Sequence, residues 1–185
     1  ANAMAIIILD RDGVINHQPD GHVTSVDEWV PIPGSIEAMA RLSQAGHQLV
    51  IATNQRGLAQ GLFDLDDLEA MHAKLRALVE DAGGEVAGIF YCPHSDEDHC
   101  RCRKPNTGLL DAIEAEFDTS LHDCFFVGDQ LKDLQCGVAK GCKPVLVQTG
   151  RGEQTLAALL ANPDPALITT AVFNDLSQFA DFVLQ

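Results

Sequence analysis

Positive charge and long apolar runs are both scarce in this chain. Its 185 residues include 12 Lys and Arg against 27 Asp and Glu, a formal net charge of −15. The average electrostatic field around the protein therefore repels the phosphates of nucleic acids and of anionic lipids. No apolar run approaches the roughly 20 residues that a membrane span requires. We predict that the protein binds neither nucleic acid nor membranes, and that any anionic substrate needs a bound cation and a few well-placed basic residues.

A secretion signal, internal repeats and low-complexity tracts are also missing. We therefore predict a cytoplasmic protein, whose six cysteines are thiols or metal ligands rather than disulfides. Residues 1–3 precede Met4 and are interpreted as a remnant of an expression vector. At this length and with 46% hydrophobic residues, residues 4–185 are predicted to form a single domain with a substantial core, and we expect a monomer.

Short apolar segments alternate with amphipathic ones along the whole chain. Strands are expected at 5–9, 48–52, 86–91, 124–127, 144–147 and 171–173, and helices at 35–45, from 64 to the glycines at 83–84, after Pro105, near 134–140, near 154–161 and from about 176. This alternation predicts a three-layer α/β fold with a mostly parallel, Rossmann-like sheet. Few insertions remain to cover the sheet edge, so any cap over the site is expected to be minimal. Ligands of such sheets bind beyond the carboxyl ends of the strands.

Acidic side chains follow two of the predicted strands. Asp10 and Asp12 come directly after the first strand, where Gly13 permits a tight turn. Alone, this pattern is equally consistent with a simple reversal of the chain. However, Asp129 and Asp133 occupy the same topological position after the fourth strand. Four carboxylates in one place repel one another unless a cation lies among them, and Mg²⁺ is the expected ion because it accepts a few carboxylates together with waters and a phosphate.

These carboxylates suit phosphoryl transfer. An unperturbed Asp titrates near 3.9, so Asp10 needs no base to attack phosphorus. Asp12 is predicted to donate a proton to the leaving group and then to activate the water that hydrolyses the aspartyl phosphate. If one of the four carboxyl groups kept its proton, it would lower the negative charge of the cluster and could also act as a general acid. The sequence therefore predicts a phosphoryl-transfer site in which Asp10 is the nucleophile.

Several polar and basic residues are predicted to hold the phosphate. The cation of Lys104 would stabilise the equatorial oxygens, while the Thr53 hydroxyl and the backbone N–H groups of Asn54 and Gln55 would bind a phosphate oxygen. Four carboxylates against Mg²⁺ and Lys104 still leave one net negative charge. We therefore also expect Arg103 or Arg56 at the site.

A loop rich in cysteine and histidine follows the third predicted strand. Cys92, His94, Cys100 and Cys102 supply three thiols and an imidazole, the set that fills a tetrahedral Zn²⁺ shell. Four protein ligands leave no open position, so we predict a structural ion in a zinc loop spanning 92–104, with His99 as a possible competitor of His94. The loop would deliver Arg103 and Lys104 to the site. Cys124, Cys136 and Cys142 are interpreted as small buried residues.

The order of these motifs resembles a known family. Asp10-Arg11-Asp12-Gly13-Val14, Thr53-Asn54-Gln55, Lys104-Pro105 and Gly128-Asp129 with Asp133 are similar to the four ordered motifs of haloacid dehalogenase superfamily phosphatases. The resemblance implies that Asp10 is the nucleophile, that Asp12 is the acid and base, and that Thr53 and Lys104 hold the phosphate. It also implies that Mg²⁺ is bound by Asp10, Asp129 and the backbone carbonyl of Asp12.

The zinc loop narrows the resemblance to the heptose bisphosphate phosphatases and the related histidinol-phosphate phosphatases. It implies a Mg²⁺-dependent phosphomonoesterase that removes the 7-phosphate of D-glycero-D-manno-heptose 1,7-bisphosphate in lipopolysaccharide heptose biosynthesis, with histidinol phosphate as the alternative substrate. The implied substrate contacts are Thr53, Asn54, Gln55, Arg103 and Lys104. Two positions depart from the family: Gln130 stands where many members have Lys, and Arg56 where a small residue is common.

A phospho-acceptor receiver domain is an alternative of another class. Such a domain also gathers acids and a lysine at strand ends. It needs only about 120 residues, however. Neither the zinc loop nor a second acid two residues after the acceptor has an evident purpose there.

Overall fold

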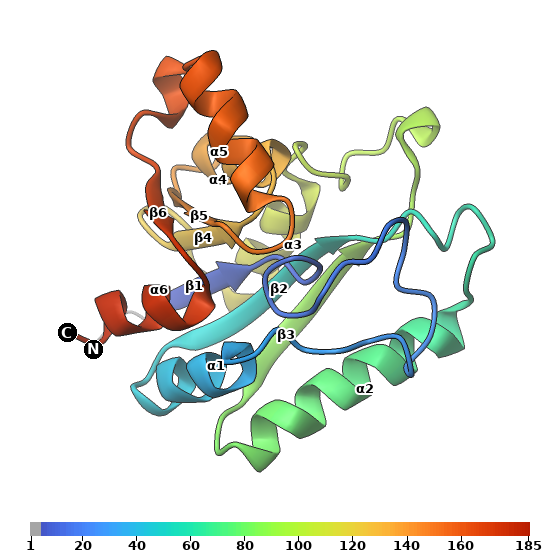
Figure 1. Cartoon of the computed structure of the whole chain (residues 1–185). Coiled ribbons are helices and arrows are strands. Elements are labelled where there is room, and N and C mark those ends of the chain that lie inside the picture. The colour runs from blue at the N-terminus through green and yellow to red at the C-terminus, as the bar shows by residue number, and fades with distance from the viewer. Residues whose placement is uncertain (1–4) are drawn as a thin grey trace.

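One parallel sheet forms the centre of the computed structural model, which describes residues 5–185 (Figure 1). Its strands are β1 (Ile6–Leu9), β2 (Gln48–Asn54), β3 (Val86–Cys92), β4 (Phe125–Gly128), β5 (Lys143–Val147) and β6 (Ala171–Phe173). They lie in the order β3-β2-β1-β4-β5-β6, and every pairing is parallel. The predicted Rossmann-like sheet is confirmed. The prediction for residues 1–3 lies outside the described residues.

Helices cover both faces of the sheet. They are α1 (Ser35–Gln44), α2 (Leu65–Asp81), α3 (Gly108–Phe117), α4 (Leu131–Ala139), α5 (Gly152–Ala161) and α6 (Leu176–Val183), with short 3₁₀ turns at η1 (Asp96–Asp98) and η2 (Pro165–Leu167). One face carries α1, α2 and α6, and the other carries α3, α4 and α5 (Figure 1). Within residues 5–185, no helix has both the length and the apolar character needed to cross a membrane.

Strand β1 shows why these strands are apolar throughout. Ile7 and Leu9 pack into the core beneath α1, α2 and α6, whereas Ile6 and Ile8 pack into the core beneath α3. All four side chains are almost completely inaccessible to solvent. A strand that is buried on both faces cannot alternate apolar with polar residues, so it appears in the sequence as a continuous apolar run.

Several element boundaries differ by one to three residues from the predictions, and two of these differences lie beside the site. Strand β2 continues through Asn54, which pairs with Cys92, so Thr53 and Asn54 end a strand rather than beginning a loop. Helix α4 begins at Leu131, three residues before the expected start, because the Asp133 carboxylate accepts a hydrogen bond from the backbone N–H of Gln130 (3.1 Å) and caps the first turn.

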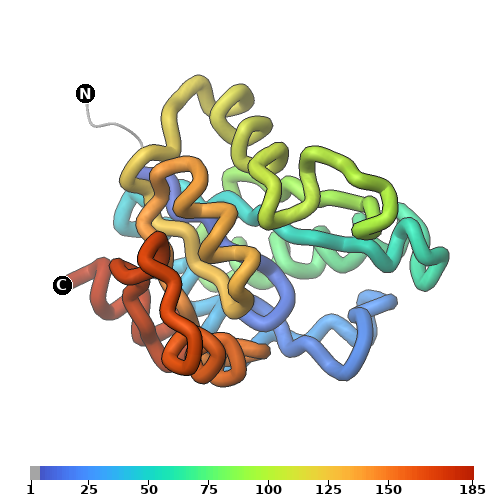
Figure 2. The backbone as a smooth tube through the Cα atoms, turned by 90° about the horizontal axis from the view of Figure 1, so that it is seen from above, coloured from blue at the N-terminus to red at the C-terminus, as the bar shows by residue number. Residues whose placement is uncertain are grey.

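The strand order places the switch point between β1 and β4. The chain moves outward on one side of β1 through β2 and β3, and then returns to the other side at β4. Loops that leave β1, β2 and β3 gather on the side of the molecule away from the C-terminus (Figure 2). Ligands bind at such a switch point in open α/β sheets.

Candidate active site

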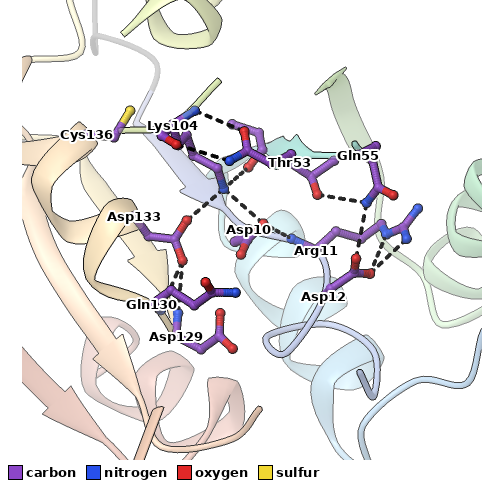
Figure 3. A network of polar contacts seen from close by, with 12 residues as sticks. Asp10, Arg11, Asp12, Thr53, Gln55, Lys104, Asp129, Gln130, Asp133 and Cys136 are labelled. Carbon is purple, nitrogen blue, oxygen red and sulfur yellow. Dashed lines mark hydrogen bonds and ion pairs between the residues drawn. The ribbon is translucent and has the colours of Figure 1, made fainter. Parts of the chain in front are cut away.

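Three buried carboxylates meet at the switch point. Asp10 follows β1, Asp129 follows β4, and Asp133 lies in the first turn of α4. Each contributes a carboxylate oxygen to a cluster in which the oxygens lie within 4.8 Å of one another (Figure 3). Of the four carboxylates predicted to converge, Asp10, Asp129 and Asp133 do so, because β1 and β4 are adjacent and parallel. The Asp12 carboxylate is not part of this cluster.

Lys104 provides the positive charge of this cluster. Its Nζ lies 3.0 Å from Asp10 Oδ1 and 2.7 Å from Asp133 Oδ1, and it also donates to the carbonyl oxygen of Ala52 (2.8 Å). Burial alone would lower the pKa of Lys104, but the two carboxylates outweigh burial and raise this pKa. Lys104 is therefore a fixed cation beside Asp10.

Asp10 and Asp129 form a candidate magnesium site. Burial and the neighbouring carboxylates raise the pKa of Asp10 to about 7 and that of Asp129 to about 8. Asp129 Oδ2 accepts from the backbone N–H of Arg151 (2.9 Å), whereas Oδ1 is buried and has no hydrogen-bond partner among residues 5–185. A divalent cation would satisfy this oxygen and offset the repulsion, so the donor set fits Mg²⁺.

Asp133 has a different part in the cluster. Its Oδ1 is paired with Lys104, and its Oδ2 accepts from the backbone N–H groups of Asp129 (3.3 Å) and Gln130 (3.1 Å). Both oxygens are thus engaged by the protein. Asp133 positions Lys104 and the turn that carries Asp129.

Gly13 allows the loops to approach Asp129 closely. Its φ of +87° is in the left-handed region, and a Cβ at this position would clash with Asp129 Oδ2. The Gly13 carbonyl also accepts a hydrogen bond from the Thr149 hydroxyl (2.7 Å). Only glycine can satisfy both the backbone conformation and the contact at this position.

The side chain of Asp12 is turned toward Arg11 and Gln55 (Figure 3). Asp12 Oδ1 lies 2.8 Å from Arg11 Nη2 and accepts from Asn16 Nδ2 (2.9 Å), and Oδ2 accepts from Gln55 Nε2 (3.2 Å). Burial would raise the pKa of Asp12, but the Arg11 charge and these hydrogen bonds outweigh burial and lower this pKa. Although Asp10 and Asp12 are only two residues apart, their environments shift their pKa values in opposite directions.

Of the predicted phosphate-binding groups, Thr53, Asn54 and Lys104 lie at this centre. The backbone N–H of Gln55 instead donates to the Cys92 carbonyl (2.8 Å), so the prediction that it binds a phosphate oxygen is wrong. The Thr53 hydroxyl accepts from Gln55 Nε2 (3.1 Å). Asn54 Oδ1 accepts from the backbone N–H of Lys104 (3.0 Å), and Asn54 Nδ2 donates to the Lys104 carbonyl (3.2 Å). Asn54 thus fastens the end of β2 to the segment that carries Lys104, while Gln55 supports Asp12 and Thr53.

A cleft of about 290 Å³ opens above Asp10. Its lining consists of Asp10, Asp12, Gln18, Gly21, His22, Thr53, Asn54, Arg56, Arg103, Lys104, Gln130, Lys132 and Arg151. Five of the chain's 12 Lys and Arg face this cleft, against two of its 27 acids. Both Arg103 and Arg56, of which the charge balance predicted at least one near the phosphate, line the cleft. Gln55 is not part of its lining.

Sequence reasoning missed other residues of the cleft. Lys132, Arg151 and the first-loop residues Gln18, Gly21 and His22 were not predicted. For Lys132 and Arg151, the available signal was a basic residue shortly after a parallel strand in a chain with little positive charge. No comparable signal marked Gln18, Gly21 and His22, because their place depends on the path of a long loop.

Three thiols meet in the cysteine-rich loop. Cys92 Sγ lies 3.5 Å from Cys100 Sγ and 2.8 Å from Cys102 Sγ, and the three sulfur atoms form one potential metal-binding group. His94 and His99 are not members of this group, and His94 Nδ1 lies 3.8 Å from an Asp98 carboxylate oxygen. Burial would raise the pKa of the Cys100 thiol, but hydrogen bonds from backbone N–H groups and neighbouring thiols lower it.

The same loop holds Arg103. Arg103 Nε donates to Asp96, and Nη1 donates to the His94 carbonyl (3.4 Å). Arg103 and Lys104 therefore lie at the cleft, as the predicted position of the loop implies. The other three cysteines pack with the α3 side of the core: Cys136 and Cys142 are buried and Cys124 is half-buried.

The fold and the carboxylate cluster define a class, the HAD-like hydrolases. Residues 101–178 match the HAD-hydrolase-like family model. The chain is similar to a solved structure, the crystal structure of D,D-heptose 1,7-bisphosphate phosphatase from B. bronchiseptica complexed with magnesium and phosphate. The two chains superpose with a TM-score of 0.93 and 47% identity over 98% of this chain and 99% of that one.

Relatives of known name specify the family. D-glycero-beta-D-manno-heptose-1,7-bisphosphate 7-phosphatase from Pseudomonas aeruginosa is 51% identical over 181 residues, which cover 98% of each chain. The enzyme of the same name from Pseudomonas putida is 49% identical over 96% of this chain and 98% of the relative. The chain belongs to the D-glycero-beta-D-manno-heptose-1,7-bisphosphate 7-phosphatase family. Because this is a family of phosphatases, the receiver-domain alternative is not retained.

Proposed function

We propose that this protein removes the 7-phosphate of D-glycero-D-manno-heptose 1,7-bisphosphate through an aspartyl-phosphate intermediate. Family membership supports the reaction, and the charge of the cleft supports the substrate: five cations against two carboxylates, in a chain of net charge −15. A sugar with two phosphates matches this excess of cations. Histidinol phosphate carries a cationic amine that the same residues would repel, so the bisphosphate is favoured.

Asp10 has one oxygen free to attack phosphorus. Its Oδ1 accepts from the backbone N–H of Arg11 (2.8 Å) and is paired with Lys104, which orients the carboxylate and leaves Oδ2 for the reaction. As Oδ2 forms its bond to phosphorus, the bond from phosphorus to the C7 oxygen breaks. Lys104, held by Asp133, offsets the negative charge of the transferring group.

Asp12 carries the protons. In its protonated form it turns from Arg11 toward the leaving oxygen and donates its proton to the alkoxide. The resulting carboxylate then takes a proton from the water that attacks phosphorus, which releases inorganic phosphate and restores Asp10. Gln55, in contact with both Asp12 and Thr53, would guide this side chain.

Magnesium is part of the proposal. Asp10, Asp129 and the backbone carbonyl of Asp12 would hold the ion, and the buried, unpartnered Oδ1 of Asp129 is the observation that favours this assignment. When bound, Mg²⁺ neutralises the carboxylates and polarises the phosphoryl oxygens. The related B. bronchiseptica enzyme contains magnesium and phosphate.

A structural zinc ion completes the proposed cofactors. We assign Cys92, His94, Cys100 and Cys102 as its ligands, supported by the convergence of the three thiols. His94 would have to leave Asp98 to complete the shell. Thiolate ligands persist in a reducing compartment, which agrees with a cytoplasmic location. We further propose that residues 4–185 act as one phosphatase domain and as a monomer.

Phosphate release from a panel of substrates tests the proposed function. Heptose 1,7-bisphosphate, histidinol phosphate and nucleotide monophosphates are compared with Mg²⁺ present and after addition of a chelator. We expect the highest kcat/KM for the bisphosphate, and loss of turnover when the ion is removed. Faster hydrolysis of histidinol phosphate would contradict the proposal.

A further inference from the structure

Three cations that line the cleft, Arg56, Lys132 and Arg151, have no acidic partner for their side chains within residues 5–185. Lys104 pairs with Asp10 and Asp133, and Arg103 pairs with Asp96. By contrast, among residues 5–185 no carboxylate oxygen lies within 4.0 Å of the side-chain nitrogens of Arg56, Lys132 or Arg151. Unpaired cations in a confined space repel one another, so their presence together indicates an anion that comes from outside the protein.

The sheet order places two of them, Arg56 and Lys132, on opposite sides of the nucleophile. Arg56 follows β2 and Lys132 lies in the first turn of α4, which follows β4. Because β1 lies between β2 and β4, its end, which carries Asp10, lies between the two loops. Arg56, Lys132 and Asp10 all line one cleft.

Both cations also lie near the Arg103–Asp96 pair. The charges of Arg103, Lys132 and Arg56 all lower the pKa of Asp96, after the hydrogen bond from Arg103. Burial and the charge of Arg103 lower the pKa of Lys132. Lys132 is thus held as a cation at an electrostatic cost, which an incoming anion would offset.

Resting on the proposed function, we propose that Arg56 and Lys132 bind the phosphate that is not transferred and so select bisphosphates over monophosphates. Arg56 offers a planar, bidentate donor to a phosphate, and Lys132 offers a compact positive charge. Lys132 supplies the cation that Gln130, which lines the same cleft, does not provide. Arg151 is not included, because its backbone N–H donates to Asp129 and so places this residue on the metal side of the cleft.

Kinetics with paired substrates test this assignment. Arg56→Gln and Lys132→Gln are compared with the wild type on heptose 1,7-bisphosphate and on the matching 7-monophosphate. Each variant should raise KM for the bisphosphate by about 10- to 100-fold, the range expected for loss of a hydrogen bond to a charged group. The kcat/KM for the bisphosphate should therefore fall at least about tenfold more than the kcat/KM for the monophosphate, which has no second phosphate.

Matched controls isolate the position of the charge. Arg41→Gln and Lys143→Gln remove the same charges from exposed positions outside the cleft and should leave both substrates unaffected. Lys132→Arg should keep the preference for the bisphosphate. Unchanged KM for the bisphosphate, or an equal loss on both substrates, would overturn the assignment.

Failure of the proposed function has a separate signature. In that case the wild type turns over another phosphomonoester faster than the heptose bisphosphate. Fructose 1,6-bisphosphate and fructose 6-phosphate then serve as competitive inhibitors of that reaction. A bisphosphate preference that Arg56→Gln and Lys132→Gln abolish supports the second subsite, whereas equal inhibition by both sugars contradicts it.

Discussion

The side chains around Asp10 and Asp12 shift the pKa values of these two nearby carboxyl groups in opposite directions. Burial and acidic neighbours raise the pKa of Asp10 to about 7, whereas Arg11 and three hydrogen bonds keep the pKa of Asp12 below its usual value. The two residues are only two positions apart and share one loop. Divergent environments of this kind let paired carboxylates take different parts in a reaction. Here the arrangement requires Asp12 to leave Arg11 before it can act as the acid.

Asp10→Asn should abolish turnover while preserving the fold. The amide cannot form the aspartyl phosphate, so we expect kcat to fall by more than about a thousandfold. The fold should persist, because a side chain whose pKa is about 7 already spends much of its time uncharged near neutral pH. Phosphate release and thermal unfolding measure the two effects. Asp81→Asn, on an exposed position at the end of α2, is the control, and residual wild-type activity in Asp10→Asn would remove Asp10 as nucleophile.

His72 should make the protein sensitive to acid. Its Nε2 lies 3.2 Å from Arg11 Nη1, and burial together with the Arg11 charge lowers the pKa of His72 to about 3. The unfolded chain binds a proton near pH 6.5 and the folded chain does not, so stability is lost as pH falls below 6.5. This loss amounts to about 2 kcal/mol between pH 6.5 and pH 5.

His72→Gln keeps an acceptor for Arg11 but cannot titrate. Urea unfolding at pH 7 and pH 5 should therefore show a smaller loss of stability at pH 5 for this variant than for the wild type. His122→Gln, on an exposed side chain, should retain the wild-type dependence. An identical pH dependence in the wild type and His72→Gln would refute the linkage.

Residues were predictable from the sequence where chemistry and spacing coincide. Asp10, Asp129 and Lys104 each stand in a short motif directly at a strand end or beside a proline, and these motifs fix their place in the site. His72 stands in ordinary helical sequence. Its contact with Arg11 arises only when α2 packs against the sheet, and no local pattern encodes that packing.

At the scale of elements, the cysteine-rich loop connects a proposed metal site to the phosphate-binding residues. It holds the three clustered thiols, and its last residues, Arg103 and Lys104, line the cleft. Asn54 ties Lys104 to the end of β2, so the loop is anchored from a second side. A metal ion at the thiols would therefore fix the position of the basic pair.

Cys100→Ser should first reduce zinc content and stability. Loss of one ligand weakens metal binding, and metal binding contributes directly to folding free energy. We expect a melting temperature lower by several degrees and a higher KM, as Arg103 and Lys104 become less well positioned. Metal analysis, thermal unfolding and kinetics measure these changes, with Cys124→Ser as the control outside the thiol cluster. Loss of activity at full zinc occupancy would show that the role is not structural.

The elements themselves were largely predictable, and their ends were not. Buried strands such as β1 are short apolar runs and α2 has a clear helical stripe, so both were found. Strand β2 reaches Asn54 only because β3 offers a pairing partner up to Cys92. The start of α4 depends on the Asp133 cap. Both boundaries are set by partners that a local pattern does not include.

For the whole molecule, strand order is what assembles the site. Alternating strands and helices predict a parallel sheet, but not that β1 lies between β2 and β4. That order brings Asp10 beside Asp129, although the two residues are far apart in the sequence. It also gathers five cations at one edge of an acidic protein. Repulsion between Asp10 and Asp129 is the electrostatic cost of this assembly, and a bound cation would relieve it.

The stabilising effect of magnesium should therefore grow with pH. The pKa values of Asp10 and Asp129 are raised to about 7 and about 8, so the folded state without magnesium loses stability as pH rises from 4 toward 8. Mg²⁺ binds the ionised carboxylates, and below these pKa values its affinity should fall by about tenfold per pH unit for each proton displaced. Thermal unfolding with and without Mg²⁺ should show a larger increase in melting temperature at pH 8 than at pH 5.5. In Asp129→Asn the increase should be small and nearly independent of pH, whereas a larger increase at pH 5.5 would place the ion elsewhere.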